Sequence, residues 1–252
     1  MDGLTLRSQT AVAALLLGAA LVAWIVTVQR MRGMDAGPGS DLGAFGWFVG
    51  IWVTMMAAMM LPSAAPAVLQ FARLRGGADT YMFVSGYLLT WTGYGLGAYA
   101  LYRGVRASAP SLLAWDERGS WLAGGALAAA GFYQLTPLKA ACLRRCRSPF
   151  HFLLRGRPGR LGAVRVGVEH GGFCVGCCTG LMLALFALGV MSLFWMAVVA
   201  AAILVEKALP GGQAFARVLA VVLVALAIWI GAAPASVPGL TQPTQMRMQT
   251  HR

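Results

Sequence analysis

Long stretches of this chain contain no charged residue, and this feature limits the possible folds more than any other. Within the first 138 residues, four such runs lack Asp, Glu, Lys and Arg altogether, and they cover residues 11–28, 42–72, 80–102 and 119–138. Each run is at least as long as the ~18 apolar residues that a membrane-spanning helix requires. Charged residues make up only 11% of the chain, whereas an ordinary soluble domain is about 25% charged. The sequence therefore predicts an all-α protein, a polytopic transmembrane helical bundle.

The first run is predicted to be a retained span and not a secretory signal. Its uncharged stretch, 11–28, is longer than the ~7–15 apolar residues of a signal-peptide core. Gln29-Arg30-Met31-Arg32 follows it, where a cleavage site would have small residues. We therefore expect this segment to anchor the chain in the bilayer.

The positive charge of the chain lies mainly between the predicted spans. Residues 139–165 contain eight basic residues and no acidic one, which is the pattern of a cytoplasmic loop in a bacterial inner-membrane protein. Counting back through four spans places the N-terminus in the cytoplasm as well. The formal net charge is +12, but a nucleic-acid site would need a basic face on a folded soluble module. No nucleic-acid partner is therefore predicted, and the expected surroundings are the lipid bilayer.

The second half of the chain decides the number of spans. Residues 171–205 are uncharged for 35 residues, about 52 Å of helix, which far exceeds a hydrocarbon core of ~30 Å. We expect the chain to turn at Gly189 and Ser192, since Gly favours helix C-caps and Ser favours N-caps. With a last span at about 213–230, this gives seven helices. The alternative is one broken, tilted helix over 166–208, which gives six.

One domain is predicted from these spans. It comprises residues 1–231 and includes the basic loop at 139–165. The remaining residues, 232–252, are rich in Pro, Gln and Thr, and this composition predicts an unstructured tail.

Five cysteines and one histidine lie on the two sides of the basic loop. They are Cys142 and Cys146 before it, and His170, Cys174, Cys177 and Cys178 after it. On a helix, His170, Cys174 and Cys177 line one face, and Cys142 and Cys146 are one turn apart. The cytoplasm keeps thiols reduced, and thiolate with imidazole suits Cu(I) or Zn(II). The pattern therefore predicts a metal site built from both halves, with buried, unliganded cysteines as the alternative.

A run of methionines in the second span is the other candidate for metal ligation. Helical spacing places Met55 over Met59 and Met56 over Met60. Thioethers are soft ligands for Cu(I), although methionines also serve as flexible core residues. Pro62 and Pro66 follow the run, and we expect them to kink or interrupt the helix and to free backbone carbonyls.

Several motifs resemble those of a known family. They are the Met59–Pro66 run, Tyr133–Lys139 with Cys142 and Cys146–Pro149, the His170–Cys178 run, and Gly189–Met196 followed by Glu206-Lys207. In this order they resemble the bacterial predicted metal-binding integral membrane proteins, a domain of unknown function. The resemblance covers about 45–212 and implies metal binding within a membrane protein. This chain has Ser192 where the family has Asn and Thr179 where the family has Trp, so neither the Asn nor the Trp side chain of the family is essential here.

We therefore predict an integral membrane protein that handles a soft metal ion, copper before zinc, by transport, delivery or storage. A metal chaperone or a metalloenzyme is the expected protein partner, and the sequence indicates no oligomeric state. One alternative is a membrane thiol–disulfide oxidoreductase that uses Cys174 and Cys177. Another is a structural or assembly subunit of a membrane metalloenzyme. Catalysis is the less favoured reading, because no quinone or flavin site accompanies the cysteines.

Overall fold

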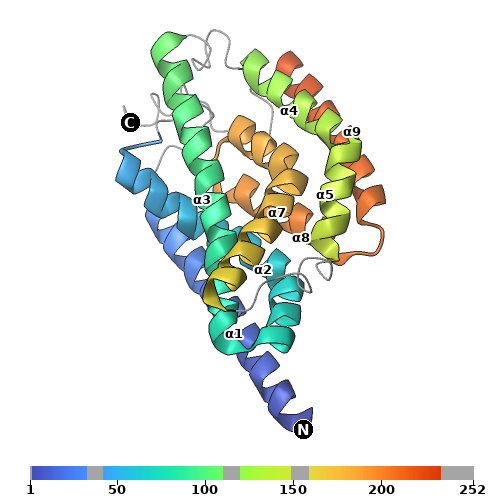
Figure 1. The fold of residues 1–252 in the computed structure, drawn as a ribbon. Coiled ribbons are helices and arrows are strands. Elements are labelled where there is room, and N and C mark those ends of the chain that lie inside the picture. The colour runs from blue at the N-terminus through green and yellow to red at the C-terminus, as the bar shows by residue number, and fades with distance from the viewer. Residues whose placement is uncertain (1, 33–41, 110–119, 149–158, 234–252) are drawn as a thin grey trace. The chain divides into compact units, whose positions relative to one another are not determined.

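The computed structural model describes residues 2–32, 42–109, 120–148 and 159–233, and most of these residues are helical (Figure 1). Those residues form eight helices and no strand. The helices are α1 (Asp2–Met31), α2 (Phe45–Arg75), α3 (Gly77–Ser108), α4 (Ser120–Gln134), α5 (Pro137–Arg147), α7 (Arg160–Leu188), α8 (Leu193–Ala208) and α9 (Gly212–Ala232). The predicted all-α class is confirmed. The predicted tail falls largely outside the described residues.

Among the described residues, four segments are long and apolar enough to cross a membrane: Gln9–Met31, Phe45–Arg75, Arg160–Leu188 and Gly212–Ala232. The other predicted spans correspond to α3, α4 and α8, which do not reach the same combination of length and hydropathy. The structure thus supports four candidate spans, and the number seven stays a prediction.

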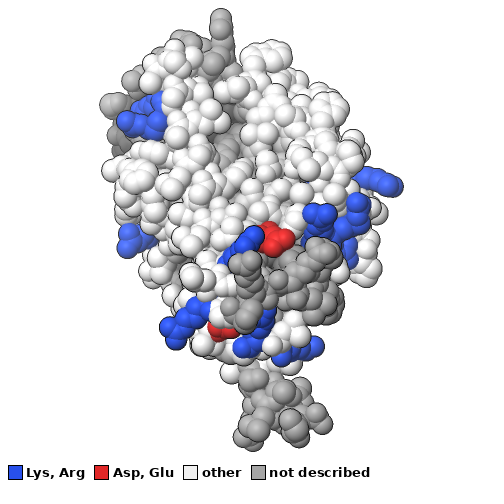
Figure 2. Space-filling model, viewed as in Figure 1, with Lys and Arg blue, Asp and Glu red and all other residues white. Residues whose placement is uncertain are grey.

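Large apolar side chains cover much of the outer surface of these helices. Leu161 is 87% exposed, Trp121 72%, Val221 71% and Leu101 70%. In Figure 2, uncharged residues form most of the visible described surface, and Lys, Arg, Asp and Glu occupy limited areas. A soluble monomer rarely exposes large continuous apolar areas, so such a surface fits contact with lipid or with other proteins.

The described residues divide into two compact units. The first contains Met1–Arg30, Ala44–Leu96 and Ala141–Cys177, and it includes all of α2. The second contains Met31–Gly43, Gly97–Ala140 and Cys178–Arg252, and it includes α4, α8 and α9. In the second unit α9 packs along α4 and contacts α8.

Helix α2 continues through both of its prolines, Pro62 and Pro66, so the expected interruption does not occur. Between them, the Ser63 hydroxyl donates a hydrogen bond of 2.9 Å to the Met60 carbonyl oxygen. Burial explains why the helix persists, because Met60, Leu61 and Ala64 are at most 4% exposed. Tertiary packing of an apolar helix outweighs the local cost of a proline.

The fourth uncharged run ends earlier than predicted and leads into a further helix. Helix α4 stops at Gln134, and α5 begins at Pro137. The Thr136 hydroxyl accepts a hydrogen bond of 3.2 Å from the Lys139 amide, which makes Thr136 the N-cap, followed by Pro at the favoured first position. The stretch expected to be a basic loop, 139–165, is thus helical at both ends, in α5 and from Arg160 onward.

The predicted turn at Gly189 and Ser192 is confirmed. Gly189 has a φ of 108°, a backbone conformation that favours glycine. Ser192 is the N-cap of α8, and its side chain accepts a hydrogen bond from the Trp195 amide. The long uncharged segment is therefore two helices, α7 and α8, and not one.

Candidate metal centre

The position of α7 in the first unit is set by a close crossing with α3. A Cβ on Gly86 would lie 2.2 Å from the Val164 carbonyl oxygen, and one on Gly167 would lie 2.0 Å from the Phe83 carbonyl oxygen. Neither distance is tolerable for a real side chain, so both glycines are required at this crossing. One turn further along, the Thr90 hydroxyl lies 3.3 Å from the Val168 carbonyl oxygen and donates to it. The contact places the aromatic face of α3 beside the cysteine-bearing part of α7.

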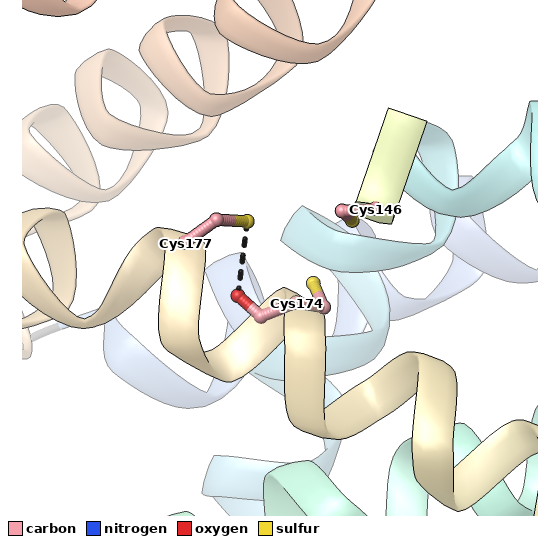
Figure 3. A group of neighbouring side chains, drawn as sticks. All are labelled: Cys146, Cys174 and Cys177. Carbon is pink, nitrogen blue, oxygen red and sulfur yellow. Dashed lines mark hydrogen bonds between the residues drawn. The ribbon is translucent and has the colours of Figure 1, made fainter. Parts of the chain in front are cut away.

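Three cysteines of the first unit converge on one small space. The Sγ atoms of Cys146, from α5, and of Cys174 and Cys177, from successive turns of α7, all lie within 4.8 Å of one another (Figure 3). The three residues are 7%, 0% and 1% exposed, respectively. A compact set of buried thiols can offer three soft ligand atoms to one metal ion.

Two of these thiols take part in hydrogen bonds. The Cys177 thiol donates to the Cys174 carbonyl oxygen at 3.2 Å, as the dashed line in Figure 3 marks. The Tyr87 hydroxyl and the Cys174 Sγ are 3.0 Å apart, and either atom could be the donor. When Cys174 is a thiolate, the hydroxyl must be the donor, because the sulfur then has no proton. Tyr87 is therefore placed to stabilise the metal-binding form of Cys174.

A cation–π contact joins α5 to α7 next to the cysteines. The Arg145 guanidinium carbon lies 5.0 Å from the centre of the Phe173 ring, within the range of a favourable contact. Arg145 precedes Cys146, and Phe173 precedes Cys174. The contact therefore helps to hold the two helices at the separation that the three thiols require.

His170 lies in the same unit but outside the group of three thiols. It is 1% exposed, and its ring centre lies 5.8 Å from that of Phe83 and 5.6 Å from that of Tyr87. Helical spacing correctly placed His170 on the side of α7 that is buried with Cys174. Its role as a ligand stays a prediction.

The two remaining cysteines also lie outside the group. Cys142 is half-buried, whereas Cys178 is 1% exposed. None of the five cysteines, all of which lie in the described residues, forms a disulfide. Of the six predicted Cys and His ligands, the structure thus brings three within mutual ligand distance.

The four methionines of the predicted run are all in the interior of the described structure. Met55, Met56, Met59 and Met60 are at most 2% exposed. Burial is compatible both with core packing and with a path for metal, so thioether ligation stays a prediction.

Comparison with known families now adds to this geometry. Residues 49–230 match the model of the PpoB2 family, which is described as copper chaperone. The match covers well over half of the chain and includes all of the cysteines. The chain belongs to the PpoB2 copper chaperone family. No curated protein and no solved structure matches it.

Membership of the PpoB2 family agrees with the three-cysteine group in pointing to copper binding. The family match thereby supports the metal-binding part of the resemblance found in the sequence. The family description says nothing about membranes or bacteria. Sequence reasoning missed Tyr87. The spacing of Phe83, Tyr87 and Trp91 marks a buried helical face, but nothing in it reveals a contact with Cys174.

A buried ion pair lies in the second unit, within the residues that the PpoB2 model covers. Lys139 and Glu206, each 1% exposed, form an ion pair with Nζ and Oε1 2.6 Å apart. The Lys139 ammonium also donates to Gln134 Oε1. This pairing ties the first turn of α5 to the last turn of α8. Sequence reasoning did not find it, because the two residues are 67 positions apart.

Proposed function

We propose that this chain is an integral membrane copper chaperone that binds Cu(I) through Cys146, Cys174 and Cys177. The observation that carries the proposal is the mutual approach of the three Sγ atoms within 4.8 Å. Membership of a copper chaperone family supports the choice of metal. The function is to hold copper and deliver it, and no catalytic step is involved.

The number and type of ligands favour Cu(I) over Zn(II). Structural zinc sites are almost always four-coordinate, and within the described residues the group consists of three thiols. Metal–sulfur bonds of ~2.3 Å in a planar three-coordinate site place the sulfurs about 4.0 Å apart. The observed group lies within reach of that geometry, and soft thiolates favour Cu(I).

The proposed location is the bacterial inner membrane, with the cysteines towards the cytoplasm. Four helices of sufficient length and hydropathy support insertion, as do the exposed apolar side chains of α4 and α9. The basic residues of 139–165 support a cytoplasmic side for α5. A reducing compartment keeps thiols available for metal. The buried methionines of α2 are proposed to carry copper within the bilayer.

Metal analysis of the full chain, purified in detergent under anaerobic reducing conditions, tests this function. The wild type should retain about one Cu(I) per chain after desalting, as a single soft site predicts. Cys146→Ser, Cys174→Ser and Cys177→Ser should each lose most of it, because a hydroxyl is a poor ligand for Cu(I). Cys178→Ser is the matched control, since this cysteine is equally buried but outside the group.

Three results would contradict the proposal. Equal copper loss in Cys178→Ser and in the three group variants would show that the group is not the site. Stoichiometric zinc in place of copper would contradict the choice of metal. Reversible disulfide formation without bound metal would favour the thiol–disulfide oxidoreductase.

A further inference from the structure

The burial of the three-cysteine group poses a problem for a protein that must exchange copper with other molecules. The three residues are at most 7% exposed. Copper moves between thiol sites by ligand exchange, in which an incoming sulfur binds the ion before the outgoing one leaves. A donor or acceptor ligand therefore needs a thiol that it can reach, connected to the buried group.

Cys142 is the one cysteine of the five that is not buried. It lies one helical turn before Cys146 on α5, a spacing that puts Cβ atoms about 5–6 Å apart on the same side of the helix. Copper bound by Cys142 is therefore within one exchange step of a member of the buried group.

Gly176 shows how the Cys142 thiol is seated. A Cβ built on Gly176 would lie 2.7 Å from Cys142 Sγ and 3.4 Å from Cys142 Cβ. The thiol thus packs against the bare backbone of α7, at a residue that lies between Cys174 and Cys177 in the sequence. Any side chain at this position would push the thiol away from α7.

We propose that Cys142 is the transfer thiol of this site, the residue through which Cu(I) enters and leaves the buried group. The inference rests on the proposed function and adds a role in copper transfer, which the binding of copper by the three buried cysteines does not itself require. On loading, the Cys142 thiol releases its proton to solvent, and its thiolate binds Cu(I) while the donor's thiolate departs. The thiols of Cys146, Cys174 and Cys177 release their protons to solvent as they bind the ion in turn, and the departing Cys142 thiolate regains a proton from solvent. Copper remains Cu(I) throughout, so no oxidant or reductant is consumed.

Separate measurement of rate and affinity tests this role. The rate is that of copper transfer from Cu(I)–glutathione to the full chain in detergent, followed by stopped flow. The affinity comes from equilibrium competition with bicinchoninate. Cys142→Ser should slow loading roughly tenfold or more, equivalent to ~1.4 kcal/mol in the barrier, while leaving the affinity within about twofold.

Two glycine variants on α7 form a matched pair. Gly176→Ala should slow loading in the same way, because its Cβ displaces the Cys142 thiol. Gly172→Ala, one turn earlier on the same helix, is the control, since its Cβ would meet nothing within 4 Å. It should change neither the rate nor the affinity.

The outcomes separate this inference from the function on which it rests. If the wild type binds no Cu(I), the proposed function fails. If Cys142→Ser weakens the affinity as strongly as Cys146→Ser, then Cys142 is a permanent ligand and the transfer role is wrong. If Cys142→Ser loads at the wild-type rate, the role is wrong as well. Because Cys142→Ser leaves α7 unchanged, misfolding of Gly176→Ala would not affect either conclusion.

Discussion

The cysteine group of the first unit and the Lys139–Glu206 pair of the second both place polar atoms in the interior, but they tolerate change differently. A thiol behaves as a small hydrophobe, and it can be buried without a ligand at little cost. A charged group in the interior is costly unless its partner is present. The thiols of the cysteine group can therefore stay buried at little cost without a ligand, whereas each charge of the ion pair needs the other.

The largest expected effect is on the ion pair. Lys139→Met leaves the Glu206 carboxylate buried without its partner, and Glu206→Gln does the same to the Lys139 ammonium. Each should lower the free energy of unfolding by ~3–5 kcal/mol, measured by denaturation in detergent. Lys207→Met, at the neighbouring half-buried lysine, is the control and should lower the free energy of unfolding much less.

The double variant Lys139→Met with Glu206→Leu sharpens the comparison. It removes both charges, so it should regain most of the stability that either single change loses. Cys174→Ser should cost only about 1–2 kcal/mol when it and the wild type are both measured free of copper. The comparison would be wrong if either single variant unfolded with the same free energy as the wild type. It would also be wrong if the double variant were no more stable than the single variants.

The next effect concerns Tyr87, which links the metal site to α3. Tyr87→Phe removes the hydroxyl that lies 3.0 Å from Cys174 Sγ while keeping the ring against His170. Loss of one hydrogen bond costs about 1 kcal/mol, so the Cu(I) affinity should fall roughly fivefold in bicinchoninate competition, with a shift in the Cu–thiolate absorption band. A structural role alone would lower stability and leave the affinity and the band unchanged.

The smallest expected effect on stability concerns the methionines of α2. Met55→Leu with Met59→Leu preserves volume and should cost less than ~1.5 kcal/mol. If these thioethers carry copper, flux in reconstituted vesicles should fall while the cysteine group still loads. Met56→Leu with Met60→Leu tests the other helix face. Normal flux in both double variants would show that the run is core packing.

Sequence patterns predicted features whose causes are local. The uncharged runs located the helices, and Gly189 with Ser192 located the turn before α8. Helical spacing placed Cys174 and Cys177 together, and the two half-sites around the basic loop predicted that Cys146 would join them. Each of these inferences needs only residues that are close in the sequence, or the expectation that the two ends of a cytoplasmic loop lie on the same side of the membrane.

Features that depend on which helix packs against which face could not be predicted. Tyr87 and Cys174 are 87 positions apart, and no periodicity relates them. Helical spacing placed His170 on the same face of α7 as Cys174. It could not show that the rings of Phe83 and Tyr87 lie beside His170. The charge of Arg144 and Arg145 pointed to a loop, whereas Leu143 and Cys146 give α5 a buried side and Thr136 caps it.

The crossing of α3 and α7 has a consequence for how variation in this protein would be read. Gly86 and Gly167 are not among the proposed metal ligands, yet any substitution at either one would force two backbones apart and carry the cysteines of α7 with them. In a mutational scan scored by copper tolerance, both positions would look as intolerant as Cys174. The positions with low fitness would therefore include both the glycines of the helix crossing and the proposed metal ligands. Measuring protein abundance as well would separate them, because substitutions at the crossing should lower abundance and substitutions of ligands should not.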